Sequence, residues 1–95
     1  MEIKDNAFNR QFESTVNGKP YVIEYSIQER KLFLTKIHQP EEIPEDDEVI
    51  NNMIKQILSD AEDKRWRVMP IHPKAVTFFR KNPAYKGMLP PGIRL

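Results

Sequence analysis

Alternation between apolar and polar positions predicts strands in the N-terminal part of the chain. The Asn17-Gly18 pair accepts the positive φ angles of a type I′ turn, so it predicts a tight hairpin between residues 8–13 and 21–27. A polar turn then leads to residues 31–37, which carry apolar residues on both faces, as is typical of a strand covered on both sides. The pattern therefore predicts a three-stranded antiparallel meander.

A wide apolar stripe predicts one long helix in the middle of the chain. Asp46 or Asp47 can cap its start, and Lys64 and Arg65 are expected in its last turn, where positive charge suits the helix dipole. The apolar residues recur at intervals of one, three and four, and they are Val49, Ile50, Met53, Ile54, Ile57, Leu58 and Ala61.

The C-terminal third predicts a strand, a second helix and an irregular tail. Residues 67–71 form a fourth strand, parallel to the third because a helical crossover joins them, and pairing should stop at Pro70. Pro73 suits the first turn of a helix that ends before Pro83, and residues 86–95 are irregular. The order β-β-β-α-β-α predicts an α+β fold in a single domain over residues 1–95.

Composition is that of a small globular protein. Hydrophobic residues are 39% and charged residues 31% of the 95 positions, which disfavours a disordered tail. No stretch approaches the ~20 apolar residues of a membrane span, and the N-terminus lacks the apolar core of a signal peptide. Without cysteine there is no disulfide and no thiolate nucleophile, and no HExxH-type spacing supports a metal site. We therefore expect a cytoplasmic protein without metal or membrane contacts.

The net charge of +1 conceals a strong asymmetry along the chain. Residues 41–63 contain nine acids and one lysine, whereas residues 64–95 contain eight bases and no acid. Charge alone favours solvated acidic and basic faces over a basic surface that meets an anionic ligand. Nucleic acid is not expected as a partner, because aromatic and basic residues are not interleaved.

Five short motifs follow one another over residues 2–85. They are Asn17-Gly18-Lys19, Val22-Ile23-Glu24-Tyr25, Phe33-Leu34-Thr35, Val68-Met69-Pro70-Ile71-His72-Pro73 and Arg80-Lys81-Asn82-Pro83-Ala84-Tyr85. In this order and spacing they resemble the motifs of the very short GNAT-like N-acetyltransferases, single-domain proteins with an active-site Cys-Pro segment. The resemblance implies a GNAT-like fold, acetyl-CoA as cofactor and an amine as acceptor.

The resemblance also implies roles for individual residues. His72 stands at the position of the family's cysteine and would be the catalytic base, with a plain polar residue in a proline-flanked turn as the alternative. His38 could line the same cleft, although an exposed loop histidine is the favoured interpretation. The implied coenzyme-binding residues are Phe33, Leu34 and Thr35 at the thioester, Asp46, Asp47, Glu48 and Val49 in the pyrophosphate loop, and Lys74, Arg80 and Lys81 at the phosphates.

The pyrophosphate loop departs from the family pattern. The family has glycines there, whose bare backbone N–H groups cradle the coenzyme A pyrophosphate. Residues 45–50 contain no glycine and four carboxylates, which would repel phosphates. Two hypotheses therefore remain open. The favoured one is an acetyl-CoA-dependent N-acetyltransferase acting on an amine; the alternative is a catalytically inactive GNAT-like domain that serves as a protein-binding module.

Overall fold

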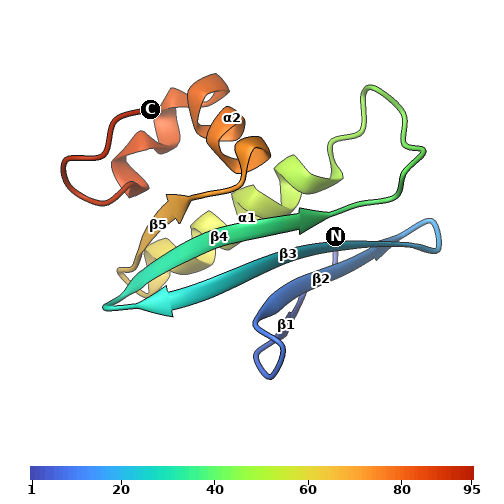
Figure 1. The fold of residues 1–95 in the computed structure, drawn as a ribbon, viewed down its shortest axis with the longest axis horizontal. Coiled ribbons are helices and arrows are strands. Elements are labelled where there is room, and N and C mark those ends of the chain that lie inside the picture. The colour runs from blue at the N-terminus through green and yellow to red at the C-terminus, as the bar shows by residue number, and fades with distance from the viewer.

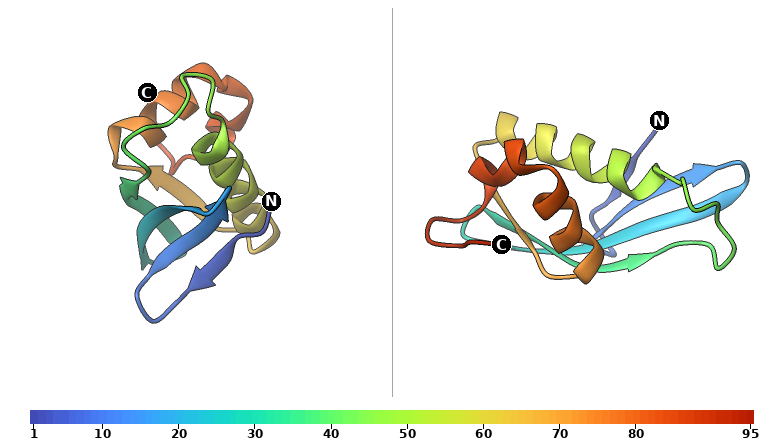
Figure 2. Two further views of the ribbon diagram at one scale, coloured as in Figure 1. Left: turned by 90° about the vertical axis from the view of Figure 1, so that its right-hand side faces the viewer. Right: turned by 90° about the horizontal axis from the view of Figure 1, so that it is seen from above.

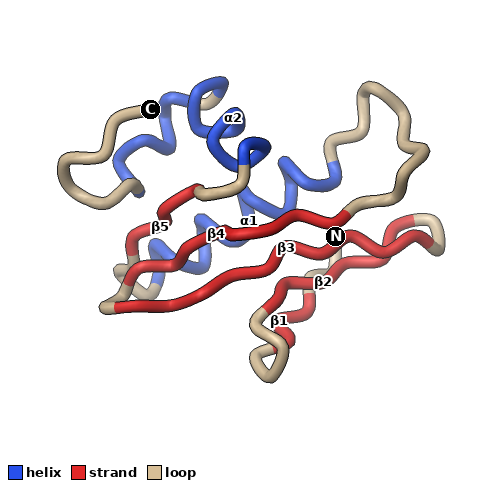
Figure 3. The backbone as a smooth tube through the Cα atoms, in the orientation of Figure 1, coloured by secondary structure: helices blue, strands red, loops and turns tan.

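A five-stranded mixed sheet forms the centre of the protein, whose computed structural model describes residues 1–95 (Figures 1 and 3). The strands lie in the order β1-β2-β3-β4-β5; β1 to β4 are antiparallel, and β5 is parallel to β4. The predicted meander, crossover helix, parallel strand and second helix are confirmed. The elements are β1 (Lys4–Asn6), β2 (Gln11–Val16), β3 (Lys19–Gln28), β4 (Lys31–His38), α1 (Val49–Asp63), β5 (Arg67–Pro70), α2 (Pro73–Lys81) and the 3₁₀ helix η1 (Pro83–Met88).

The N-terminal strands differ from the prediction in one respect. The Asn17-Gly18 hairpin is confirmed, with φ of 54° and 75° at its two central residues. The predicted strand over residues 8–13 begins too early, because Phe8 lies in the turn that joins the unforeseen β1 to β2, and its side chain is 95% exposed. Three residues of β1 are too few for alternation to reveal a strand.

A β-bulge interrupts β4 at Thr35. Glu24 of β3 pairs with Lys36, but the next residue, Tyr25, pairs with Leu34, so Thr35 has no partner in the ladder. The parallel ladder with β5 also ends here, since its last pair is Leu34 with Pro70. The predicted stop at Pro70 is confirmed, and β4 continues to His38 without β5 beside it.

The end of α1 corrects a second expectation. Lys64 and Arg65 follow the helix instead of lying in its last turn. Arg65 has a φ of 61°, its N–H donates to the Glu62 carbonyl at 3.0 Å, and Trp66 N–H donates to the Ala61 carbonyl at 2.8 Å. These two bonds form a Schellman motif, which turns the chain sharply into β5.

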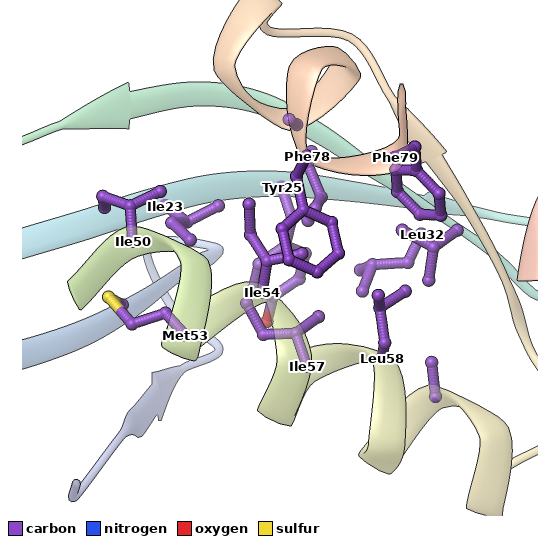
Figure 4. Packing of buried hydrophobic residues seen from close by; sticks show 14 of the residues in the cluster. Ile23, Tyr25, Leu32, Ile50, Met53, Ile54, Ile57, Leu58, Phe78 and Phe79 are labelled. Atoms are coloured by element: carbon purple, nitrogen blue, oxygen red, sulfur yellow. The ribbon is translucent and has the colours of Figure 1, made fainter. Parts of the chain in front are cut away.

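Both helices contribute to one apolar core. Figure 2 shows α1 across one face of the sheet and α2 near the edge formed by β4 and β5, with no helix on the other face. The strand over residues 31–37 was expected to be covered on both faces, and this is wrong: Leu32 and Leu34 are buried, whereas Phe33 is only half-buried. Figure 4 shows part of the core, whose fully buried side chains include Ile23, Leu34, Met53, Ile54, Leu58, Val68, Phe78 and Phe79.

The C-terminal residues pack on the domain more closely than an irregular tail would. Residues 86–88 belong to η1, and Leu89 after it is buried in the core cluster. The Arg67 guanidinium also donates to the Gly87 carbonyl, which links β5 to η1. None of the helices has the length and apolar character needed to cross a bilayer.

Replacing Phe79 by alanine tests the core. Its ring is 0% exposed, so the substitution should lower the free energy of unfolding by about 3–5 kcal/mol. Phe8→Ala is the matched control and should change it by less than about 0.5 kcal/mol, because that ring is in solvent. Urea unfolding followed by Trp66 fluorescence measures both. Similar losses in the two variants would contradict the described packing.

Candidate functional site

A groove of about 430 Å³ lies between the start of α1 and α2. Three of the residues to which the resemblance assigns coenzyme binding line it: Asp47, Lys74 and Lys81. Arg80 is exposed and lies outside it. One wall is formed by Gln39, Ile43, Pro44, Glu45, Asp47, Ile50 and Asn51, and the other by Pro73, Lys74, Thr77, Phe78, Lys81 and Asn82.

His72 is fixed at the point where β4 and β5 separate. Its backbone N–H and that of Ile71 both donate to the Leu34 carbonyl, at 3.1 and 3.0 Å. It is also the N-cap of α2, and its Nδ1 accepts a hydrogen bond from the Lys74 backbone N–H at 3.1 Å. A neutral imidazole has one lone pair for this purpose, so the cap bond places the ring proton on Nε2. In this arrangement Nε2 is a donor, and His72 must release its cap before Nε2 can accept a proton.

The pKa of His72 is lowered from its ordinary value of 6.5. Partial burial is the main cause, followed by the positive charges of Lys74 and His38. At neutral pH the His72 ring is therefore uncharged, as the cap bond also requires.

His38 contacts a carboxylate that the sequence did not reveal. Its Nε2 contacts the Glu24 carboxylate across the β3–β4 ladder. Glu24 alternates with the buried Ile23 and Tyr25, so it lies on the face away from the core. No Lys or Arg side chain lies within ion-pairing distance of a carboxylate in the chain. The sequence could not predict this contact, because it depends on the register between β3 and β4. In that register Glu24 pairs with Lys36 and lies diagonal to His38. The His38 Nδ1 makes no hydrogen bond within the chain.

The three residues expected at a thioester lie where the two strands part. Phe33 still pairs with Met69 of β5, and the carbonyl of Leu34 accepts the two N–H groups already described. Thr35 lies at the bulge, beyond the parallel ladder, and its hydroxyl donates to the Glu24 carbonyl at 3.2 Å. The main chain of β4 is therefore unpaired on its β5 side from Thr35 onward.

At the start of α1, the backbone N–H of Val49 is bonded to a carboxylate of the chain, that of Asp47. Asp47 Oδ1 accepts from the Val49 N–H at 2.9 Å, and Oδ2 accepts from the Tyr21 hydroxyl at 2.6 Å. This second bond is the largest cause of the raised pKa of Tyr21. Asp46 and Glu48 are exposed; Glu48 occupies the N-cap position without capping the helix and accepts from Asn51 at 2.7 Å.

The residues at this end of α1 do not fit the diphosphate of coenzyme A. A diphosphate needs the free N–H groups of a helix start and close backbone approach, which glycines allow. Here Asp47 engages the first N–H, the loop of residues 39–48 has no glycine, and its six carboxylates form no ion pair. Lys74 and Lys81 on the opposite wall do suit an anion. Only one side of the groove is therefore compatible with phosphate.

A pH titration tests the capping role of His72. Its folded pKa is below the unfolded value, so its contribution to stability is present above pH ~6.5 and is lost as the pH falls through the lower folded value. Imidazole ¹⁵N NMR should show the proton on Nε2 of the neutral ring. Lys74→Gln should raise the pKa of His72, while Lys81→Gln, from the same helix, should leave it unchanged. A neutral ring protonated on Nδ1 would contradict the cap.

Comparison with known proteins identifies the fold. The chain is similar to the solution structure of a GCN5-like protein from Staphylococcus aureus with an inferred N-acetyltransferase activity, with a TM-score of 0.75 over 98% of this chain and 90% of that chain. Sequence identity is 16%, so the likeness concerns the fold. No protein-family profile and no curated protein sequence matches the chain. The protein has the α+β, GNAT-like fold that the order of its elements predicts.

Proposed function

We propose that this protein is a GNAT-like domain that binds another protein and does not transfer acetyl from coenzyme A. The observation that carries the proposal is the Asp47 carboxylate at the start of α1, bonded to the Val49 N–H and the Tyr21 hydroxyl. The family resemblance assigns the residues at this helix start to the diphosphate of coenzyme A. With no cysteine, the chain suits a reducing cytoplasm, which we include in the proposal.

A diphosphate that bound at the start of α1 would have to displace the Asp47 carboxylate from its hydrogen bonds, which is energetically unfavourable. The two hydrogen bonds to its carboxylate are charge-assisted, and each such bond contributes about 1.5–3 kcal/mol. The displaced carboxylate would remain beside Glu45 and the incoming phosphates, with no cation within ion-pairing distance of either side chain. The same charges favour a partner that brings its own basic groups to this wall.

The groove suits a protein segment better than a polyanion. Glu45 and Asp47 line one wall, and Lys74 and Lys81 line the other, so the two signs of charge face each other. A segment carrying both acidic and basic side chains can complement both walls, whereas a diphosphate complements one. His72 supports a binding role as well, because its lone pair holds the start of α2 in position.

An acetyl-CoA-dependent N-acetyltransferase acting on an amine is the second candidate. The fold and the unpaired edge of β4 from Thr35 onward favour it. In that case Lys74 and Lys81 would face the phosphates, and an uncharged imidazole would take the proton of the attacking amine. His72 would have to release Lys74 N–H to do so, whereas His38 has an unbonded Nδ1 and a carboxylate at its other nitrogen.

An amide-shift NMR titration with acetyl-CoA separates the two candidates. We expect no saturable shifts at Thr35, Val49 or Lys74 at millimolar ligand. The double variant Glu45→Gln/Asp47→Ser should gain weak binding, because serine still caps the helix but brings no charge. Glu41→Gln/Glu42→Gln removes the same charge outside the groove and should gain none. Saturable binding by the unaltered protein would contradict the proposal and direct the work to amine acetylation.

Charge reversal in the groove tests the binding role directly. Lys74→Glu/Lys81→Glu should abolish capture of a partner in affinity purification, because both side chains line the groove. Arg80→Glu lies on the same helix but outside the groove, and it should retain the partner. Equal loss in both variants would assign the interaction to overall charge and not to the groove.

A further inference from the structure

A second cavity, of about 360 Å³, lies between the C-terminal half of α1 and the sheet. Trp66, which directly precedes β5, lines it, whereas His72 follows the end of that strand. Six residues of extended chain separate the two by about 20 Å, so this cavity is distinct from the groove between α1 and α2. It is lined by Ile3, Asp5, Phe12, Tyr25, Ile27, Leu32, Gln56, Ile57, Asp60, Ala61, Asp63, Lys64 and Trp66.

Residues of α1 and of the strands β1, β2 and β3 line the cavity together. In Figure 1, α1 crosses behind β4 and β5, and the β1–β2 hairpin lies below it. The rings of Phe12 and Tyr25 stack with centroids 4.6 Å apart, and with the half-buried Trp66 they give the cavity an aromatic lining. Ile57 of α1, a core residue labelled in Figure 4, also lines the cavity. An apolar, flat group can therefore replace water here with a gain in free energy.

The rim of the cavity is acidic. Asp60 and Asp63 are three residues apart on α1, which places them on one face of the helix. Asp5 reaches the rim from β1, where its carboxylate accepts the Tyr25 hydroxyl at 2.6 Å. Burial, followed by this bond to Asp5, raises the pKa of Tyr25 to about 12, so the phenol stays protonated as the donor. None of the three carboxylates is in an ion pair.

The only cation at the cavity shows how an ammonium is accommodated. Lys64 Nζ lies 5.2 Å from the centroid of the Trp66 ring, within the range of a cation–π interaction. The three rim carboxylates exceed this single positive charge by two. One aromatic residue of the cavity, Trp66, therefore contacts an ammonium group. The carboxylates at the rim carry more negative charge than Lys64 neutralises.

From these features we propose that the cavity binds a small organic cation in which an ammonium is joined to a flat apolar body, as in an aryl-alkylamine. The ring enters the lining of Phe12, Tyr25 and Trp66, and the ammonium stays at the rim with Asp60 and Asp63. The volume is at the lower end of the ~300–1,000 Å³ typical of ligand sites, which suits one ring with a short chain. This site is independent of the function proposed above.

Fluorescence of Trp66 provides the test, because it is the only tryptophan in the chain. The probe is phenethylamine, which is protonated at pH 7, and 2-phenylethanol is its neutral counterpart of similar shape. We expect saturable changes in Trp66 emission with the amine, and at least about fivefold weaker binding of the alcohol, because it lacks the attraction to the rim. Equal affinity for the two compounds, or no saturable change with the amine, would overturn the proposal.

Three variants assign the binding to the cavity. Asp60→Asn should weaken phenethylamine binding by roughly two- to fivefold, as expected for one exposed charge pair. Glu62→Gln removes the same charge from a neighbouring position outside the cavity and should leave the affinity unchanged. Lys64→Met removes the competing ammonium and should strengthen binding by a similar factor. Weakening by Lys64→Met, or equal weakening by Glu62→Gln and Asp60→Asn, would overturn the assignment; thermal unfolding of each variant verifies its fold.

Discussion

The structure depends on the point at which β4 and β5 stop pairing. The Leu34 carbonyl receives two N–H groups, from Ile71 and His72, and Pro70 before them has none to donate. With the Thr35 bulge on the other side of β4, these bonds end the parallel ladder and direct the chain out of the sheet. The turn that follows sets the start of α2, and so it sets the groove, the packing of Phe78 and Phe79, and the surroundings of His72.

Most of the fold could be predicted because it follows from periodicity and from a few residues with strong preferences. The stripe of α1, the Asn17-Gly18 turn and the stop at Pro70 are local properties, and all were confirmed. Two of the features that were missed depend on contacts distant in sequence. The Thr35 bulge appears only when β3 is laid beside β4, and the open face of the sheet depends on where the helices pack.

The candidate site could be predicted only as a set of residues near one end of the sheet. The groove does bring Asp47, Lys74 and Lys81 together, but their roles depend on partners that the sequence does not place. Asp47 is bonded to Tyr21, which lies 26 residues away. His72 was expected to be a base because the family resemblance puts it at the position of the active-site cysteine, and its use of Nδ1 as a cap appears only in the structure. Glu24 and His38 are brought together by a strand register that no local pattern reveals.

The two-residue turns of the sheet have a consequence for the order of folding. Asn17 and Gly18 adopt positive φ readily, whereas Glu29 and Arg30 at the β3–β4 turn have φ of 52° and 61° against their own preference. The first turn can therefore form before its strands are complete, while the second is held only by the ladder around it. We expect β2 and β3 to pair early and β4 to join later. The end of the β4–β5 pairing at Leu34, on which the groove depends, is then among the last features to form.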